Sequence, residues 1–436
     1  MKPNRPHRCS QCGQVGHRIE SCPILRKRAP KAKAKKAALQ KSYKKIRRTP
    51  TYKKTPYASS SRAPPVLIKT LKQKPFTAYT NLTGKAARRE LIRMGLLPKS
   101  SPASMTCWKC QETYSIASAT PNEFRCWNRN CRCRIRNLDV AWTPVYHWQR
   151  GGHEIHKPLL LALYTLGIKV PTDAAQHLIG ASYDTTEALM KMLKLALAYA
   201  ELTRGREVRF PAGGLEFDGT STNTDRSSSK TKSSYCGRFL VAVHRDTQEF
   251  ALEPLGDVTV QKGAPPPPES LSDVGPLMDR HITEDNWVST DSAKAFKAYI
   301  KSHLRVRGVF HATVVHKKGE YVKLVSCPLS KLSPLLRQKA ALVSSTSART
   351  AKFKAGDQFA EGLFSVVKRN MVRLNLKGVT GKASINFLAC AWLKRFPGME
   401  GVALGVKKYQ DDMRGHIDPF LAFKDDSWLC PMPEQE

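Results

Sequence analysis

The sequence has no apolar run of about 18 residues, which is the length that a membrane-spanning helix requires. Its first residues, Met1–His7, are polar and basic, so they lack the apolar core of a secretory signal peptide. These two absences predict a protein that stays in a reducing compartment and has no membrane partner. Twelve cysteines in such a compartment are more typical of metal sites than of disulfide bonds.

Acidic residues are also scarce. The 436-residue chain has 35 Asp and Glu against 73 Lys and Arg, giving a net charge of +38, and no acid lies between Glu20 and Glu90. This excess of cations predicts a polyanionic partner, and nucleic acid is the usual one. An anionic membrane surface is the competing polyanion. The length leaves room for two or three domains with at least one sizeable core.

The first motif is a cluster of metal-ligand residues at the N-terminus. It has the spacing C-x2-C-x4-H-x4-C and consists of Cys9, Cys12, His17 and Cys22. This pattern resembles the zinc knuckle of retroviral nucleocapsid-type proteins, and we assign it to residues 1–24. Three thiolates and one imidazole close a tetrahedral Zn²⁺ shell, which is typical of a structural site. Knuckles bind single-stranded nucleic acid, so DNA and RNA both remain candidates, and protein binding is the alternative.

Residues 25–76 carry repeated Lys and Arg clusters without apolar periodicity. Self-repulsion of like charges predicts a disordered basic arm that binds phosphates and that could act as a nuclear localisation signal. We therefore expect a nuclear protein if the source is eukaryotic, and otherwise a protein of the cytoplasm or nucleoid. Residues 77–103 contain a short basic helix that ends at Gly95.

A second cysteine cluster lies within residues 104–148. Cys107 and Cys110 form one pair, and Cys126 is followed by Cys131 and Cys133. Two pairs around a short β-rich loop are typical of a zinc ribbon, with redox-active cysteines as the alternative. Cys131 is slightly favoured over Cys133 as the fourth ligand. The sequence thus predicts two structural Zn²⁺ ions.

Residues 150–207 are helical in pattern. A helix from Thr172 to a turn at Gly180 is followed by a helix after Ser182, and both Thr172 and Ser182 are candidate N-caps. This spacing suits a helix-turn-helix whose second helix would enter the major groove of DNA. A generic helical hairpin has the same pattern.

Residues 208–405 contain three acids whose positions suggest chemistry. Asp218 and Asp291 each end a strand-like run, and Glu361 lies on an amphipathic helix whose polar face also carries Ser365 and Lys368. Three antiparallel strands followed by alternating helices and strands predict a mixed α/β sheet of the ribonuclease H-like type. Residues 317–354 are expected to be a loop-rich stretch, and 406–436 a C-terminal tail.

In such a sheet the three acids would converge at one place. Clustered carboxylates repel one another unless a cation neutralises them, and oxygen ligands suit Mg²⁺ or Mn²⁺. Two such ions can support in-line displacement at phosphorus.

The span from about Cys107 to Phe396 resembles the ISXO-type insertion-sequence transposases and their eukaryotic Merlin relatives, which are DDE enzymes. The features that carry the resemblance are the zinc ribbon, the helix-turn-helix, and the motifs Glu216-Phe-Asp218, Val288-Ser-Thr-Asp291, Val314-Val-His316, Ala360-Glu361-Gly-Leu-Phe-Ser-Val-Val-Lys368-Arg369 and Ala383–Arg395. The chain departs from the family at Gly219, where the family has an acid, and at Asp357-Gln-Phe359, where the family has Asn-Thr.

The resemblance implies a DNA transposase with a catalytic pair of Mg²⁺ or Mn²⁺ ions. It implies that Asp218, Asp291 and Glu361 hold the metals, that His316 is an accessory histidine and that Lys368 contacts a substrate phosphate. DNA would be the partner, bound by a homo-oligomer. Two alternatives remain at this point: a domesticated relative that binds nucleic acid without cutting it, and a nuclease of the same fold that cuts RNA.

Overall fold

The computed structural model describes residues 75–97, 156–223, 233–261, 264–304, 308–318, 320–343, 349–376 and 383–413, with short segments between 105 and 136. The predicted knuckle, the basic arm and most of the C-terminal tail lie outside the described residues. The described elements all belong to one compact unit, Thr70–Glu436.

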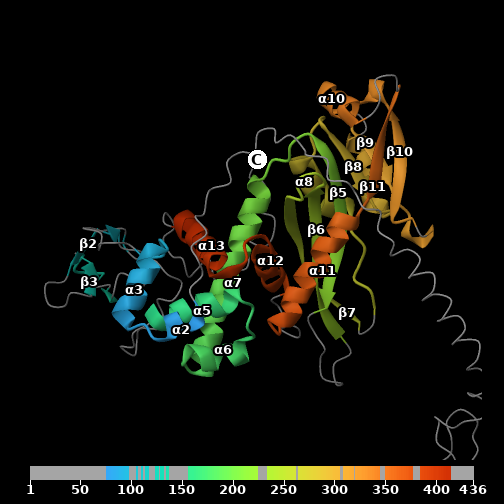
Figure 1. Ribbon diagram of the computed structural model, residues 1–436. Helices are drawn as coiled ribbons and strands as arrows, with labels where there is room; N and C mark the ends of the chain where they lie inside the picture. Colours follow the sequence, from blue (N-terminus) through green and yellow to red (C-terminus); the bar gives the residue numbers. More distant parts are fainter. Residues whose placement is uncertain are drawn as a thin grey trace, which may run out of the picture. The chain divides into compact units, whose positions relative to one another are not determined.

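A five-stranded mixed sheet forms the centre of this unit (Figure 1). Its strands are β5 (Gly213–Asn223), β6 (Ser233–His244), β7 (Phe250–Gln261), β8 (Asn286–Thr290) and β9 (Phe310–Thr313). Their order in the sheet is β7-β6-β5-β8-β9, and β6 alone runs against the others. The predicted mixed α/β class is therefore confirmed.

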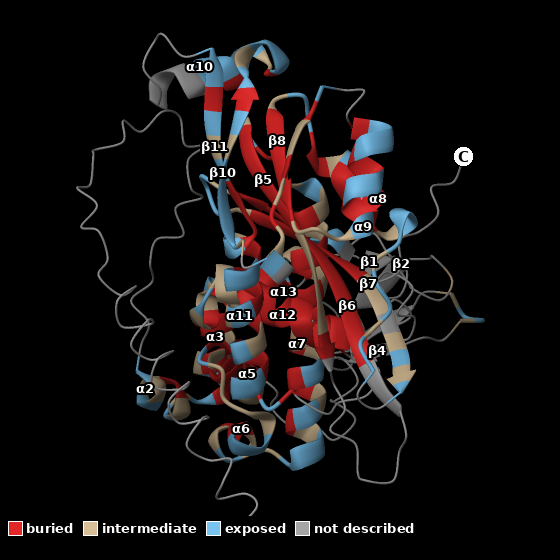
Figure 2. Ribbon diagram, turned by 90° about the vertical axis from the view of Figure 1, so that its right-hand side faces the viewer, coloured by how far each residue is buried: buried red, intermediate tan, exposed pale blue. Residues whose placement is uncertain are grey.

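Alternating side chains of β6 build a hydrophobic core on each face of the sheet. Phe239, Val241 and Val243 pack on one face, whereas Leu240 and Ala242 pack on the other. Because strand side chains alternate, every second residue of a central strand reaches the same layer of helices. Figure 2 shows the resulting arrangement, with buried central strands beside helices that are exposed only on their outer faces.

Different helices cover the two faces. The core of the first face includes residues of α7 (Tyr183–Glu207), α11 (Gln358–Arg373), α12 (Ala383–Arg395) and α13 (Gly398–Met413). The second face is covered by α8 (Leu271–His281), α9 (Lys294–Tyr299) and the π-helical turn Ile300–Leu304. The predicted division of α11 into an apolar and a polar face is confirmed for the residues at its centre. Leu363, Val367 and Met371 are buried, while Glu361 and Ser365 are exposed.

The helices before the sheet partly match the prediction. They are α2 (Phe76–Thr80), α3 (Gly84–Arg93), α5 (His156–Gly167) and α6 (Thr172–Ile179), followed by α7. Ser182 is the N-cap of α7, and its hydroxyl accepts a hydrogen bond from Thr185 N. The prediction of Thr172 as an N-cap is wrong, because Pro171 takes that position and supplies no side-chain acceptor. None of the helices in the described ranges is long and apolar enough to cross a membrane.

The stretch between β9 and α11 is more ordered than the sequence suggests. It contains β10 (Val322–Pro328), α10 (Pro334–Val343) and β11 (Thr350–Gly356), and the two strands pair antiparallel. The prediction of a loop-rich stretch is therefore wrong. β10 buries only Cys327 and exposes Val322 and Leu324, so it lacks the alternation by which a half-buried strand is detected.

The cysteine-containing segment before α5 forms a small antiparallel sheet in the order β1-β2-β3-β4. Its strands are Met105–Thr106, Thr113–Ile116, Glu123–Cys126 and Arg134–Arg136. Cys110 lies between the first two strands, and Cys131 lies in the turn before the fourth. This β-rich backbone agrees with the predicted loop. Zinc ligation remains a prediction, because Cys107 and Cys133 lie outside the described residues.

Candidate functional site

The first two predicted acids occupy neighbouring places in the sheet. β5 and β8 are parallel, and Phe217 pairs with Thr290, so the next residues along each strand are Asp218 and Asp291. Parallel neighbours lie about 4.8 Å apart, which brings these two residues together. Asp291 directly follows β8, as predicted. Asp218, however, lies in the middle of β5 and not at a strand end, because β5 continues to Asn223.

Asp218 lies in an unfavourable electrostatic environment for a carboxylate. Burial, and then the negative charge of Asp291, raise the pKa of Asp218 to about 8, with smaller contributions from Asp357 and Glu361. One hydrogen bond opposes this shift, from Gly219 N to Asp218 Oδ1 at 2.8 Å. Three other acids, Asp291, Asp357 and Glu361, are thus close enough for their charges to act on Asp218.

Gly219, which directly follows Asp218 on β5, lies close to an acid from a distant part of the sequence. A Cβ atom at this position would collide with the Glu269 carboxylate, which comes from the loop before α8. Glu269 and Gly219 both line a pocket of about 260 Å³.

The same pocket contains the predicted phosphate contact. It is lined by Gly219, Thr220, Ser221, Arg238, Pro266, Pro267, Glu269 and Lys368. Lys368 on α11 donates a hydrogen bond from Nζ to Thr220 Oγ1 at 2.7 Å. Burial lowers the pKa of Lys368, and the charge of Asp218 opposes this effect. An ammonium group in this place can contact an anionic oxygen next to the acids.

Glu361 reaches the cluster from the first turn of α11, and a buried acid on β5 fixes that turn. The Glu216 carboxylate accepts hydrogen bonds from Phe359 N at 2.8 Å and from Ala360 N at 3.1 Å. These N–H groups are among those that a helix leaves unpaired at its start. Because Glu216 and Asp218 are two residues apart on β5, they face the same side, and this cap ties the helix of Glu361 to the strand of Asp218.

Arg245 holds Glu216 in place. It forms an ion pair with Glu216 and donates a hydrogen bond to Gly356 O at 3.1 Å. Its guanidinium group also lies over the rings of Trp287 and Phe359, at 5.5 and 5.4 Å from their centroids. Burial raises the pKa of Glu216 to about 7, although Arg245 and the two N–H donors favour the ionised form.

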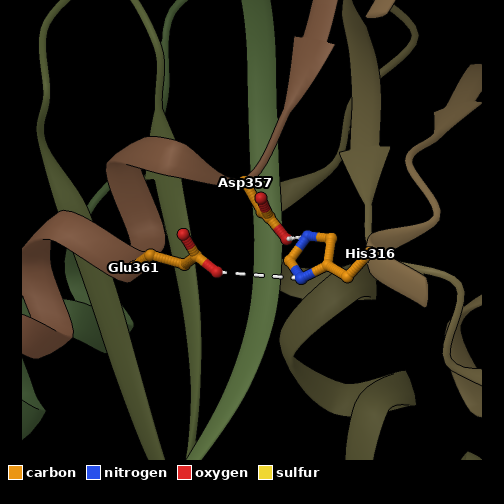
Figure 3. Close-up of side chains that lie close together, drawn as sticks. All are labelled: His316, Asp357 and Glu361. Carbon is orange, nitrogen blue, oxygen red and sulfur yellow. Dashed lines mark ion pairs between the residues drawn. The ribbon is translucent and has the colours of Figure 1, made fainter. Parts of the chain in front are cut away.

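His316, Asp357 and Glu361 form a compact group at the start of α11 (Figure 3). His316 Nε2 lies 2.6 Å from Asp357 Oδ2, and His316 Nδ1 lies 3.8 Å from Glu361 Oε1. One ligand atom from each of the three side chains lies within 4.8 Å of the other two. The run Val309–Val315 in the sequence predicts a strand with His316 at its end. This prediction is wrong, because β9 ends at Thr313 and His316 begins a short 3₁₀ turn.

The structure brings together all five predicted catalytic residues, namely Asp218, Asp291, His316, Glu361 and Lys368, and adds two that the sequence did not reveal. Asp357 is completely buried beside His316, and Glu216 caps α11. Glu216 could have been suspected, because an acid two residues before Asp218 shares its face of the strand. The role of Asp357 had no such local signal, since an Asp before a helix is ordinarily a cap.

A group of acids with one imidazole and one ammonium can hold divalent cations and an anionic substrate side by side. These residues are the evidence for the chemistry of the site. No protein-family model, no curated protein and no solved structure matches this chain.

Proposed function

We propose that this protein is a divalent-metal-dependent DNA transposase that cuts and joins phosphodiester bonds with Asp218, Asp291 and Glu361. The observation that carries the proposal is the convergence of these acids, from β5, from the end of β8 and from α11, around a carboxyl group whose pKa is raised to about 8 by burial and by its neighbours. Acids packed in this way favour a cation between them.

The fold supports the proposal. The strand order β7-β6-β5-β8-β9, with β6 alone reversed, is the order expected of a ribonuclease H-like domain. In that fold the first and fourth strands in sequence carry acids side by side, as β5 and β8 do here. The excess of cations in the sequence, +38 in net charge, supports a nucleic-acid substrate.

The acids fit Mg²⁺ or Mn²⁺ because their oxygens are hard ligands and the Asp357 carboxylate is buried with no hydrogen-bond donor. Asp218, Asp291 and Glu361 would hold the metals. Two bound ions would supply activation of a water or 3′-hydroxyl nucleophile and charge stabilisation at the leaving oxygen.

The chain's own residues would prepare the substrate for this step. Lys368 lies beside Asp218 and would contact a phosphate oxygen. Glu216 keeps the first turn of α11 on β5, so that Glu361 stays on the same side of the sheet as Asp218. The exposed N-terminal part of α7 carries Asp184 and Glu187, so its contact with DNA would depend on other residues.

The test is strand cleavage of labelled duplex DNA by the full-length protein with Mg²⁺ or Mn²⁺. Asp291→Ala should reduce cleavage by at least about a hundredfold, as expected when transition-state charge stabilisation is lost. DNA binding, measured by fluorescence anisotropy, should persist and weaken steeply with salt. Glu284→Ala is the matched control, because Glu284 is an exposed acid shortly before β8.

Undiminished cleavage by Asp291→Ala would contradict the assignment. DNA binding by the wild-type protein without cleavage under either metal would favour the domesticated, non-cleaving alternative. Preferential cleavage of a matched RNA duplex would point to the ribonuclease alternative.

A further inference from the structure

Asp357 occupies a helix-capping position without acting as a cap. It directly precedes α11, where an Asp side chain ordinarily accepts a hydrogen bond from the second or third helical N–H group. Here Asp357 makes no such bond, and Glu216 accepts from both of these groups, on Phe359 and Ala360. The Asp357 carboxylate is thus left to interact with His316 instead of the helix (Figure 3).

No hydrogen bond of ordinary geometry reaches this carboxylate from the described residues. Asp357 is 0% exposed, and neither of its carboxylate oxygens receives a hydrogen bond. His316 Nε2 lies 2.6 Å from Asp357 Oδ2 and is the described group that partly compensates the carboxylate. A buried carboxylate in this condition is costly unless a cation compensates it.

The backbone on both sides of Gly356 holds Asp357 in this position. Gly356 N donates to Ser289 Oγ at 2.9 Å, and Gly356 O accepts from Arg245. A Cβ atom at Gly356 would lie 2.8 Å from Tyr321 O, so the close approach of β11 to the start of β10 requires glycine. The orientation of Asp357 therefore results from several independent contacts.

The distances suit a bound metal ion. Two ligands of one ion with bonds near 2.1 Å lie about 3–4 Å apart, and His316 Nδ1 and Glu361 Oε1 are 3.8 Å apart. The Asp357 carboxylate next to the other ring nitrogen would fix the orientation of the ring, as carboxylates do for metal-bound histidines.

We propose that His316, Asp357 and Glu361 form a site for one divalent transition metal, with the imidazole of His316 as a direct ligand. Nitrogen ligation favours ions such as Mn²⁺ over Mg²⁺, which strongly prefers oxygen ligands. The inference rests on the proposed function in so far as Glu361 is shared with the catalytic acids. It adds that one of the metal positions selects its ion through His316 and Asp357.

The experiment uses Mn²⁺ as the probe and the full-length, tag-free protein after chelator dialysis. Pulsed electron paramagnetic resonance of the bound Mn²⁺ should show coupling to a ¹⁴N nucleus, replaced by a ¹⁵N coupling when the protein is labelled with ¹⁵N-histidine. His316→Asn should abolish this coupling. Asp357→Asn should weaken Mn²⁺ binding by about 10–100-fold, the usual effect of removing a group that supports a metal-bound histidine.

His177→Asn is the matched control, because His177 is exposed on α6, and it should leave both the coupling and the Mn²⁺ affinity unchanged. Absence of nitrogen coupling in the wild-type protein would overturn the proposal even if a variant failed to fold. Coupling that survives in His316→Asn would overturn it as well.

The outcome is separable from that of the proposed function. A His316-dependent Mn²⁺ signal in a protein that cleaves no DNA would uphold the metal site and refute the enzymatic proposal. Cleavage that depends on Asp291, without nitrogen coupling, would do the reverse.

Discussion

Two acids in this protein are equally buried but have different partners. Glu201 on α7 and Asp357 before α11 are both 0% exposed, and burial raises the pKa of both carboxyl groups. Arg395 donates to both oxygens of Glu201, from Nη2 at 3.0 Å and from Nε at 3.3 Å. The described partner of Asp357 is His316, whose Nε2 lies 2.6 Å from Oδ2 and lowers the pKa of Asp357 without overcoming the effect of burial. Glu201 is paired with a permanent cation that joins elements of the fold, whereas Asp357 faces an imidazole that is charged only when protonated.

We expect the stability of the protein to depend strongly on Arg395, because this arginine compensates the buried Glu201. Arg395 also lies over the Phe250 ring at 3.7 Å and pairs with Glu249, so it joins α12 to α7 and β7. Arg395→Ala would leave Glu201 buried and unpaired, and we expect the free energy of unfolding to fall by about 3–5 kcal/mol. Urea denaturation measures this change.

The matched control is Arg369→Ala, an arginine exposed on α11, which should change stability by less than about 0.5 kcal/mol. A small effect of Arg395→Ala would mean that Glu201 is compensated in some other way and that the contrast with Asp357 is not real.

Glu216 extends the comparison of buried acids to the site itself, because it lies there and has partners for its charge. Its partners Phe359 and Ala360 are 143 and 144 residues away in sequence. Glu216→Gln removes the ion pair with Arg245 and weakens the cap, and should destabilise the protein by about 1–3 kcal/mol. Because the start of α11 would be less firmly held, cleavage should fall at constant DNA affinity, and Glu216→Asp should restore part of it.

A purely structural role would lower stability equally in both variants without changing the rate of cleavage by the folded protein. Single-turnover cleavage at a temperature well below unfolding separates the two outcomes.

Asp218 provides a prediction in which the sign of the effect is informative. Its folded-state pKa is raised from an ordinary 3.8 to about 8, so folding favours the protonated form. The corresponding stability is complete below about pH 4 and is lost as the pH rises through 8. Without metal, Asp218→Asn should therefore raise the melting temperature at pH 8, by roughly 2–4 °C for each kcal/mol gained in a domain of this size.

At pH 5 the gain from Asp218→Asn should shrink, because the wild-type carboxyl group is then largely protonated. Added Mn²⁺ should stabilise the wild type and not the variant. A variant that is less stable than the wild type at pH 8 would show that Asp218 is compensated within the protein, as Glu201 is.

Local patterns in the sequence predicted only part of the site. Asp218 follows Phe217, Asp291 follows the run Trp287–Thr290, and Glu361 lies opposite Leu363 and Val367 on a helix. Strand and helix patterns were therefore sufficient to pick out these acids, although Asp218 lies within its strand and not at the end. The parallel pairing of β5 with β8, which puts the first two acids side by side, depends on contacts across more than 70 residues and could be predicted only by analogy to a fold.

The role of Asp357 and the capping role of Glu216 could not be predicted from local sequence, although Glu216 could be suspected of lying in the site because it shares a strand face with Asp218. An Asp before a helix is normally its cap, but here Glu216 from β5 accepts the hydrogen bonds in place of Asp357. The β10–α10–β11 segment was not predicted either, because it too lacks a local signal in the sequence. Its strands are held mainly by pairing with each other, and β10 shows no regular alternation of apolar residues.

The central claim is that Asp218, Asp291 and Glu361 hold divalent metal. Its most direct test is a crystal structure of the protein soaked with Mn²⁺, with the ions located by anomalous scattering. We predict an anomalous peak within about 2.5 Å of carboxylate oxygens of both Asp218 and Asp291, with Glu361 near the same cluster. A fully occupied protein whose anomalous peaks lie only at cysteine clusters, with Asp218 and Asp291 diverging from each other, would contradict the claim.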